Sequence, residues 1–435
     1  MKERYTESAP LTEFLPGSGS TRQQLLERCL SRYARVDPVL HAFVPDTVQP
    51  EVVRTEHRRA IGAGGALAGV PFAVKDIIAV DGLPRSGGSA LPAQALAGAE
   101  SSVVRQLRRA GAVPFGVSVS TEFAWFKPGA TRNPVDIRHT PGGSSSGSAA
   151  AVAAGIVPLA IGTQTIGSVI RPASFCGVVG YKPSQGLLPR DGILSVSTTM
   201  DHPGFFTQDL AGMIEVARVS GLIPNDAESR LPPLILCTGA YLKQADSLTV
   251  SLFTKIADEL SAAGFVVKQE DPFHDDEIHR ISAAHRTICA REFHHAHSTL
   301  FGSYGKLYSP TSEAFFREGS QVTAGVYFQA LEMREQWLAR FGACTPGQTP
   351  GAIYLSPAAV GLAPVGLETT GDPTMNLPWT FLGAPALSLP LSDDLRGGKL
   401  PMGLQLTTAR FGDGALLHAA ATLQEAEVSQ WLFAR

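Results

Sequence analysis

Three polar segments of the chain combine residue types that support nucleophilic chemistry. Residues 141–148 have the sequence PGGSSSGS and run into an alanine-rich stretch, while residues 162–168 have the sequence GTQTIGS and follow an apolar run. In a third segment, Lys75 interrupts the apolar run 70–80. A serine hydroxyl becomes a nucleophile when a neighbouring base removes its proton. A buried lysine can be that base, because burial disfavours its charged form.

Each segment taken alone also has another interpretation. A glycine-rich loop before a helix can bind phosphate through its backbone N–H groups. Segment 141–148 lacks the Gly-Lys-Ser/Thr ending and the GxGxxG spacing of nucleotide sites, which argues against a nucleotide. A structural Ser/Gly turn stays open for this segment. Lys75 alone is more typical of a surface lysine whose stem lies along apolar neighbours.

Histidines at 285, 294, 295 and 297 form a second group of candidate functional side chains, which could bind a metal ion. His294 and His297 are three residues apart on an expected helix, a spacing that suits a metal ion. No carboxylate or cysteine completes a metal-binding motif around them. We therefore predict no metal site.

Helices that alternate with short apolar strands are expected to position these segments. Helices are predicted over 21–37, where Thr21 begins the helix and Pro38 ends it, after Pro50, over 101–110 and over 148–154. Strands are predicted within 70–80 and over 113–115 and 156–161, so Ser168 lies on a turn beyond a buried strand. Helical stretches near 250–263, 278–297 and 321–341 follow in a less regular region. This alternation indicates an α/β fold.

Composition narrows the class of protein. The chain has 435 residues, of which 44% are hydrophobic and 17% charged, and a net charge of −3. Such a balance gives no electrostatic footprint for nucleic acid or for an anionic membrane. The apolar run 149–161 is too short to span a bilayer, and five scattered cysteines, an odd number, argue against a disulfide framework. We expect a cytoplasmic protein with no nucleic-acid or membrane partner.

The three segments in combination resemble the amidase-signature family, whose pattern includes GxPxxxKD (here 69–76), PGGSSxGS (141–148) and GTxxxGSxxRPA (162–173). The resemblance is strong from about 65 to 210 and returns weakly at 376–405. It implies a three-layer α/β/α sandwich around a central mixed β-sheet, formed by one domain over 1–435. Within that domain we expect N-terminal helices (1–64), a catalytic core (65–210), a variable substrate-side region (211–370) and a C-terminal return to the core (371–435).

The resemblance also implies roles for individual residues. Ser168 would be the nucleophile, Ser144 the bridging serine after a cis peptide bond, and Lys75 the base. The oxyanion hole would consist of backbone N–H groups of the loop Thr165, Ile166, Gly167 and Ser168. The family's mechanism needs no cofactor and no metal. The implied reaction is hydrolysis of the C–N bond of a small amide, anilide or carbamate through an acyl-enzyme.

One departure from the family pattern concerns Ile166, since the family usually has two glycines before the nucleophile. We expect Ile166 to adopt an ordinary φ and to leave the oxyanion hole intact. Arg171 matches the position at which malonamidase-like members carry a carboxylate-binding arginine. Trp125 and Phe126 are further candidates for substrate contact. Because Ile166 and these aromatic residues add apolar bulk, we predict a neutral apolar substrate.

Three alternatives to this function stay open. The first is an amidase for dicarboxylate monoamides such as malonamate, in which Arg171 grips the free carboxylate. The second is the amidotransferase A-subunit, which shares the triad of Lys75, Ser144 and Ser168 and works with partner chains. The third is a non-catalytic scaffold of the same fold, suggested only by Ile166. We expect the protein to be a monomer or a homodimer.

Overall fold

A ten-stranded mixed β-sheet forms the centre of the protein in a computed structural model, which describes residues 4–15, 21–223, 231–342, 351–426 and 433. The order of the strands is β2-β1-β3-β5-β4-β9-β10-β8-β6-β7. The strands are β1 Pro71–Lys75, β2 Val113–Ser118, β3 Leu159–Gln164, β4 Val179–Lys182, β5 His202–Thr207, β6 Leu234–Cys237, β7 Val267–Glu270, β8 Ile353–Pro357, β9 Ala386–Pro390 and β10 Gly403–Thr407.

Strand direction changes across the sheet. The strand β1 runs parallel to β2 and β3 at one end, and β6 runs parallel to β8 and β7 at the other. The pairs in between are antiparallel. Parallel pairs need a crossover connection, and the helices that supply these crossovers cover the sheet. The predicted mixed sheet is therefore confirmed.

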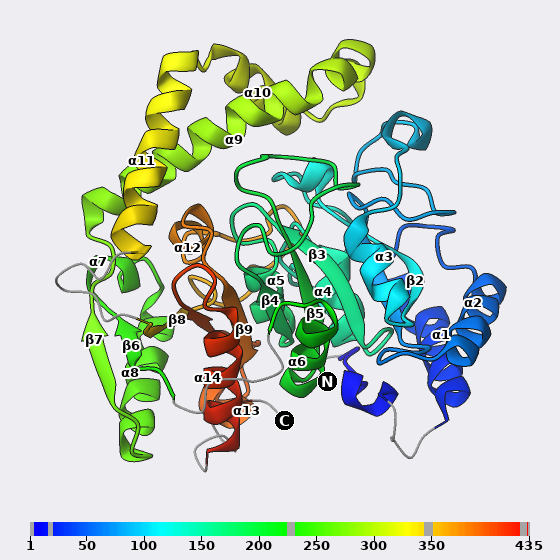
Figure 1. The fold of residues 1–435 in the computed structure, drawn as a ribbon, viewed down its shortest axis with the longest axis horizontal. Coiled ribbons are helices and arrows are strands. Elements are labelled where there is room, and N and C mark those ends of the chain that lie inside the picture. The colour runs from blue at the N-terminus through cyan, green and yellow to red at the C-terminus, as the bar shows by residue number, and fades with distance from the viewer. Residues whose placement is uncertain (1–3, 16–20, 224–230, 343–350, 427–432, 434–435) are drawn as a thin grey trace.

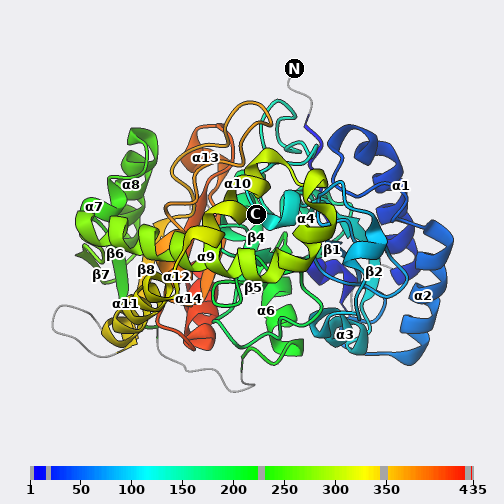
Figure 2. The same ribbon diagram turned by 90° about the horizontal axis from the view of Figure 1, so that it is seen from above.

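Helices cover both faces of the sheet and also extend above one end of it (Figures 1 and 2). Helices α4 and α5 pack together over the central strands, α6 packs with α14 against β4, β5, β9 and β10, and α9, α10 and α11 form an arm above the sheet. This arrangement is the predicted three-layer sandwich. The helices are α1 Arg22–Leu40, α2 Pro50–Ala63, α3 Ser102–Arg109, α4 Ser146–Ala153, α5 Ile170–Cys176, α6 Leu210–Val219, α7 Gly239–Leu242, α8 Ser247–Ala262, α9 Asp275–Tyr304, α10 Pro310–Gln321, α11 Ala324–Gly342, α12 Leu377–Phe381, α13 Asp393–Arg396 and α14 Asp413–Glu425.

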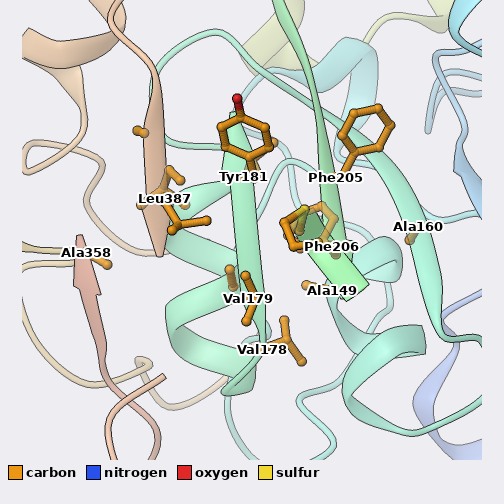
Figure 3. Packing of buried hydrophobic residues seen from close by; sticks show 14 of the residues in the cluster. Ala149, Ala160, Val178, Val179, Tyr181, Phe205, Phe206, Ala358 and Leu387 are labelled. Carbon is orange, nitrogen blue, oxygen red and sulfur yellow. The ribbon is translucent and has the colours of Figure 1, made fainter. Parts of the chain in front are cut away.

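The hydrophobic core lies on the central strands (Figure 3). Tyr181 of β4 pairs with Phe205 of β5 and with Leu387 of β9. Phe206 points to the opposite face of β5 from Phe205, since successive side chains of a strand alternate. A Cβ atom at Gly162 of β3 would lie 2.6 Å from the Phe206 ring, so only glycine fits beside that ring.

The first helix is longer than the sequence predicts. Thr21 accepts a hydrogen bond from the Gln24 amide, as expected for its N-cap, but the helix continues through Pro38 to Leu40. Because Pro38 lies in the last turn, it removes only one backbone donor. The carboxylate of Asp37 accepts the amide of Ala42 at 2.8 Å and supports the end of the helix.

None of the described helices is both long and apolar enough to cross a membrane.

Candidate active site

Lys75 ends β1, a strand whose five residues are all buried. Its Nζ lies 2.7 Å from Ser144 Oγ and 2.8 Å from Thr163 Oγ1. It also donates to the carbonyl oxygen of Thr163 at 3.3 Å. Burial lowers the pKa of Lys75 well below its usual value of 10.5, and the more distant charge of Asp201 opposes this shift only in part. The surroundings of Lys75 therefore favour an uncharged amine.

Ser144 lies in the glycine-rich segment that precedes α4. The peptide bond between Gly143 and Ser144 is cis, as the sequence resemblance implies. The serine side chain is 3% exposed and faces Lys75 on one side and a cavity on the other. Ser144 therefore connects the buried lysine to the space where a substrate can bind.

Ser168 lies on the turn between β3 and α5, in the position predicted beyond a buried strand. The Gln164 side chain holds this turn, because its Oε1 accepts the amides of Val169 and Ile170 at 2.9 and 3.0 Å. Ser168 is 7% exposed and lines the same cavity as Ser144. The geometry thus brings Lys75, Ser144 and Ser168 to one place, although they lie far apart in the sequence.

The loop before Ser168 presents backbone N–H groups that have no acceptor. Among the described residues, no oxygen accepts the amides of Ile166, Gly167 or Ser168. The carbonyl of Gly167 accepts the Arg171 amide at 3.0 Å. Unpaired N–H groups at the edge of a cavity are suited to bind a negatively charged oxygen.

Ile166 adopts an ordinary φ, as predicted, since it is absent from the residues of positive φ. The following Gly167 is needed for space, because a Cβ there would lie 2.3 Å from Oδ1 of Asn376. A loop with isoleucine at 166 therefore keeps its backbone amides and gains an apolar side chain, which lines the cavity.

The cavity between these residues is small, with a volume of about 20 Å³. Its walls bring together the three predicted substrate-contact residues, Trp125, Phe126 and Arg171, with Ile166 of the predicted oxyanion loop. The other described residues on its walls are Ala124, Ser144, Thr165, Gly167, Ser168, Thr370 and Pro373. Thr370 is the described residue of the predicted substrate-side region 211–370 that lines the cavity.

The helix α10 of the arm packs against the wall of the cavity that Trp125 and Phe126 form. Trp125 stacks on Phe315 of α10, with ring centroids 3.7 Å apart. Next to it, the buried carboxylate of Glu122 accepts the Ser312 hydroxyl at 2.7 Å and the Ser309 amide at 3.2 Å, at the start of α10. The arm therefore fixes the position of the wall.

Arg171 is buried beside the cavity, with only part of its guanidinium satisfied. Its Nη2 donates to the carbonyl oxygen of Gly143 at 2.8 Å and to Thr370 Oγ1 at 3.0 Å. Among the described residues its Nε and Nη1 have no partner. Burial lowers the pKa of Arg171 to about 10, so the side chain is still charged at neutral pH.

The histidines at 285, 294, 295 and 297 do not gather around one point. Nε2 of His285 lies 2.9 Å from the carbonyl oxygen of Thr165, and Nδ1 of His297 lies 2.9 Å from the Tyr308 hydroxyl. Nδ1 of His294 faces the carbonyl oxygen of Phe316. Within the described ranges, no group of three His, Cys, Asp or Glu side chains is arranged to hold a metal ion.

Sequence reasoning missed several residues of the site. Thr163 contacts Lys75, and Thr370 and Pro373 line the cavity. Asn376 leaves space only for a glycine at position 167. Thr163 lies within a segment that the sequence singled out, and its place beside the last residue of a strand was a usable signal. Thr370 and Pro373 lie in a stretch whose pattern carries no such signal.

Comparisons with known proteins concern the family and the fold of the chain. The family model described as Amidase matches residues 24–336. The A-subunit of glutamyl-tRNA(Gln) amidotransferase from Symbiobacterium thermophilum is 40% identical over 238 residues, which are 51% of this chain and 48% of that protein. The chain thus spans about half the length of the first curated relatives it matches. The corresponding amidotransferase chain of Thiobacillus denitrificans is 28% identical over 94% of both chains.

Solved structures with the same fold include an amidase, with a TM-score of 0.81 and 27% identity over 92% of this chain and 95% of that one. Another belongs to a vestigial protein complex that bears on the origins of an s-triazine catabolic enzyme. It has a TM-score of 0.82 and 26% identity over 96% of this chain and 98% of that one.

Proposed function

Because the chain belongs to the amidase family, we propose that it is a serine hydrolase that cleaves amide C–N bonds through an acyl-enzyme. The observation that carries this proposal is the short contact of 2.7 Å between Lys75 Nζ and Ser144 Oγ at the edge of the cavity that Ser168 also lines. Because Lys75 contacts Ser144, and Ser144 and Ser168 line the same cavity, we infer that a proton can pass between these side chains in that order.

The proton path begins at Ser168. As its Oγ attacks the substrate carbonyl carbon, the Ser168 proton passes to Ser144, which gives its own proton to the lone pair of Lys75 Nζ. A hydroxyl can carry out this relay because it donates and accepts at once. The path then runs backwards and delivers the proton to the leaving nitrogen. Water hydrolyses the acyl-enzyme by the same route.

Charge that develops on the substrate oxygen needs donors already in place. The amides of Ile166, Gly167 and Ser168 would bind this oxygen, since they have no acceptor among the described residues and lie at the cavity. Removing one such donor from a hydrolase costs about 10²–10³ in kcat. The loop therefore supplies a large share of the proposed catalysis.

For the substrate, we favour a neutral amide, anilide or aryl carbamate with an apolar acyl side. Ile166, Trp125 and Phe126 supply apolar walls, and burial of a carboxylate against them is costly. A second candidate is a dicarboxylate monoamide, which Nε and Nη1 of Arg171 favour, because both donors have no hydrogen-bond partner among the described residues and a substrate carboxylate could accept from one of them.

A third candidate follows from the name of the curated relatives, which are A-subunits of glutamyl-tRNA(Gln) amidotransferase. A glutaminase assay on the chain alone, and with added partner chains and tRNA, separates it from the amidase. Glutamine turnover that depends on the partners would favour the amidotransferase. Turnover of small amides by the chain alone would favour the amidase.

The test of the proposed function is a panel of malonamate, short aliphatic amides, p-nitroanilides and aryl carbamates. We expect Ser168→Ala to abolish turnover, and Ser144→Ala and Lys75→Ala to lower it by several orders of magnitude. Ser146→Ala is the matched control, because Ser146 lies in the same segment and donates to the carbonyl of Val119 instead. Equal activity in wild type and Lys75→Ala at neutral pH would contradict the proposed mechanism.

A further inference from the structure

We propose that His285 and Thr380 are positioning residues that aim two backbone amides of the oxyanion hole at the substrate. This inference rests on the proposed function and extends it, because it assigns a part in catalysis to two side chains outside the triad and the nucleophile loop. The residues come from α9 and α12, which lie far from the nucleophile in the sequence. Each one contacts a carbonyl oxygen of the loop.

The geometry of the peptide unit connects these contacts to the amides. The C=O of one residue and the N–H of the next share a plane, and in a trans peptide they point in opposite directions. The peptide bonds of this loop are trans, since Gly143–Ser144 is the cis bond of the described residues. A group that holds the carbonyl of Thr165 therefore also orients the amide of Ile166. In the same way, the carbonyl of Ile166 orients the amide of Gly167.

His285 holds the first of these units. Its Nε2 lies 2.9 Å from the carbonyl oxygen of Thr165. Because a carbonyl oxygen can only accept, Nε2 must carry the proton and donate it. The imidazole is 1% exposed, so water does not replace this donor. The contact draws the carbonyl of Thr165 toward α9, and the amide of Ile166 then points the other way, with no acceptor among the described residues.

Thr380 holds the second unit. Its Oγ1 donates to the carbonyl oxygen of Ile166 at 2.5 Å and accepts from Gln164 Nε2 at 2.9 Å. The threonine has one hydroxyl proton, and the amide of Gln164 already occupies its acceptor side, so that proton is committed to the loop carbonyl. Gln164 also accepts the amides of Val169 and Ile170. One chain of hydrogen bonds thus fixes the loop on both sides of Ser168.

Both contacts act on donors that matter most in the transition state. The substrate carbonyl carries little charge in the ground state and a full negative charge in the tetrahedral intermediate. An amide with the wrong orientation therefore weakens binding of the transition state more than binding of the substrate. This lowers kcat and leaves KM nearly unchanged. Residues that only support folding would lower the amount of active enzyme and its stability without this selective effect.

The first test uses substitutions at the two positions and measures kcat and KM on the best substrate of the panel. We expect His285→Leu and Thr380→Val each to lower kcat by about 10²–10³, the cost of one oxyanion donor, with KM within about threefold. His285→Gln and Thr380→Ser keep a donor near the same place, and we expect them to recover at least a tenth of the wild-type kcat.

His297→Leu is the matched control. His297 is also a buried histidine of α9, and its Nε2 lies 3.2 Å from a backbone carbonyl, but that carbonyl belongs to Ser195 and not to the loop. We expect this variant to lose stability in thermal unfolding while its kcat stays within about threefold of wild type. A kcat loss as large as that of His285→Leu would show that any buried histidine of α9 matters equally, and would overturn the inference.

The second test measures inhibitor binding and does not depend on turnover. A boronic acid or trifluoromethyl ketone forms a tetrahedral adduct on Ser168, whereas the product carboxylic acid does not. We expect the inhibition constant of the tetrahedral inhibitor to rise by about the factor by which kcat falls, with product inhibition unchanged. If both variants bind the tetrahedral inhibitor like an active wild type, the inference is wrong. If the wild type itself neither turns over substrate nor reacts with a fluorophosphonate, the proposed function is wrong.

Discussion

Replacement of Lys75 by methionine separates the catalytic role of this residue from its effect on stability. Methionine keeps most of the length and the apolar stem of the side chain and removes the amine. In the native protein the amine is fully buried and its pKa is lowered well below 10.5. In the unfolded chain the same amine has its usual pKa, so unfolding takes up a proton at every pH between the two values.

The magnitude follows from that one proton. Linkage requires the free energy of unfolding of the wild type to rise with pH by about 1.4 kcal/mol per pH unit relative to Lys75→Met, between the lowered pKa and 10.5. The sign is fixed because the unfolded state binds more protons. Stability is therefore lost as pH falls from 10.5 toward the lowered pKa, and below that value the difference is constant. Catalysis should fall by about 10²–10⁴, the usual share of a general base.

The assay is urea denaturation of both proteins at about pH 8.5 and 9.5, within the window that linkage defines. Tyrosine and cysteine ionisation is common to the two chains, so it cancels in the difference. We expect this difference to change by about 1.4 kcal/mol in favour of the wild type at the higher pH. Parallel behaviour of the two proteins would mean that Lys75 keeps its proton in the native state, and it would refute the assignment of Lys75 as the base.

Further predictions concern the rate and the cavity walls. The kcat/KM of the wild type should rise with pH to a plateau, because only uncharged Lys75 accepts a proton; an acid optimum in a pH–rate profile would contradict this. Arg171→Met should spare p-nitroanilide turnover if the substrate is neutral, whereas a selective loss of malonamate turnover would identify an acidic substrate. Ile166→Gly should lower the free energy of unfolding by about 1–2 kcal/mol in urea titrations, since a half-buried side chain and backbone rigidity are both lost. Glu122→Gln should destabilise the protein by about 2 kcal/mol by the same assay, because the start of α10 loses a charged acceptor.

Local patterns in the sequence were sufficient to predict the N-terminal part of the fold, which includes one end of the sheet. The order of helix and strand from α1 to β3, the turn that carries Ser168 and the cis bond at Ser144 were all expected. Apart from the cis bond, which the family resemblance implies, these features depend on signals within a few residues, such as an N-cap, a buried apolar run or a glycine. The prediction that Pro38 ends the first helix is wrong, because the effect of a proline depends on its place within the last turn, which the sequence alone does not show.

The rest of the site depends on contacts between distant segments. His285 was considered as a metal ligand, because it lies near three other histidines in the sequence, whereas in the fold it faces the carbonyl of Thr165. Thr380 lies in α12, which contacts the nucleophile loop, and the following strand β9 pairs with β4 in the sheet. No pattern within either helix indicates these partners, since both arise from the packing of the arm and the C-terminal region on the core.

The identity of the nucleophile is the central claim, and intact-mass and peptide mass spectrometry can establish it. The protein is incubated with an activated aryl carbamate, digested, and searched for the carbamoyl group. We predict one adduct on Ser168, absent from Ser168→Ala and formed far more slowly in Lys75→Met. An adduct on another residue, or full amide turnover in Ser168→Ala, would contradict the account.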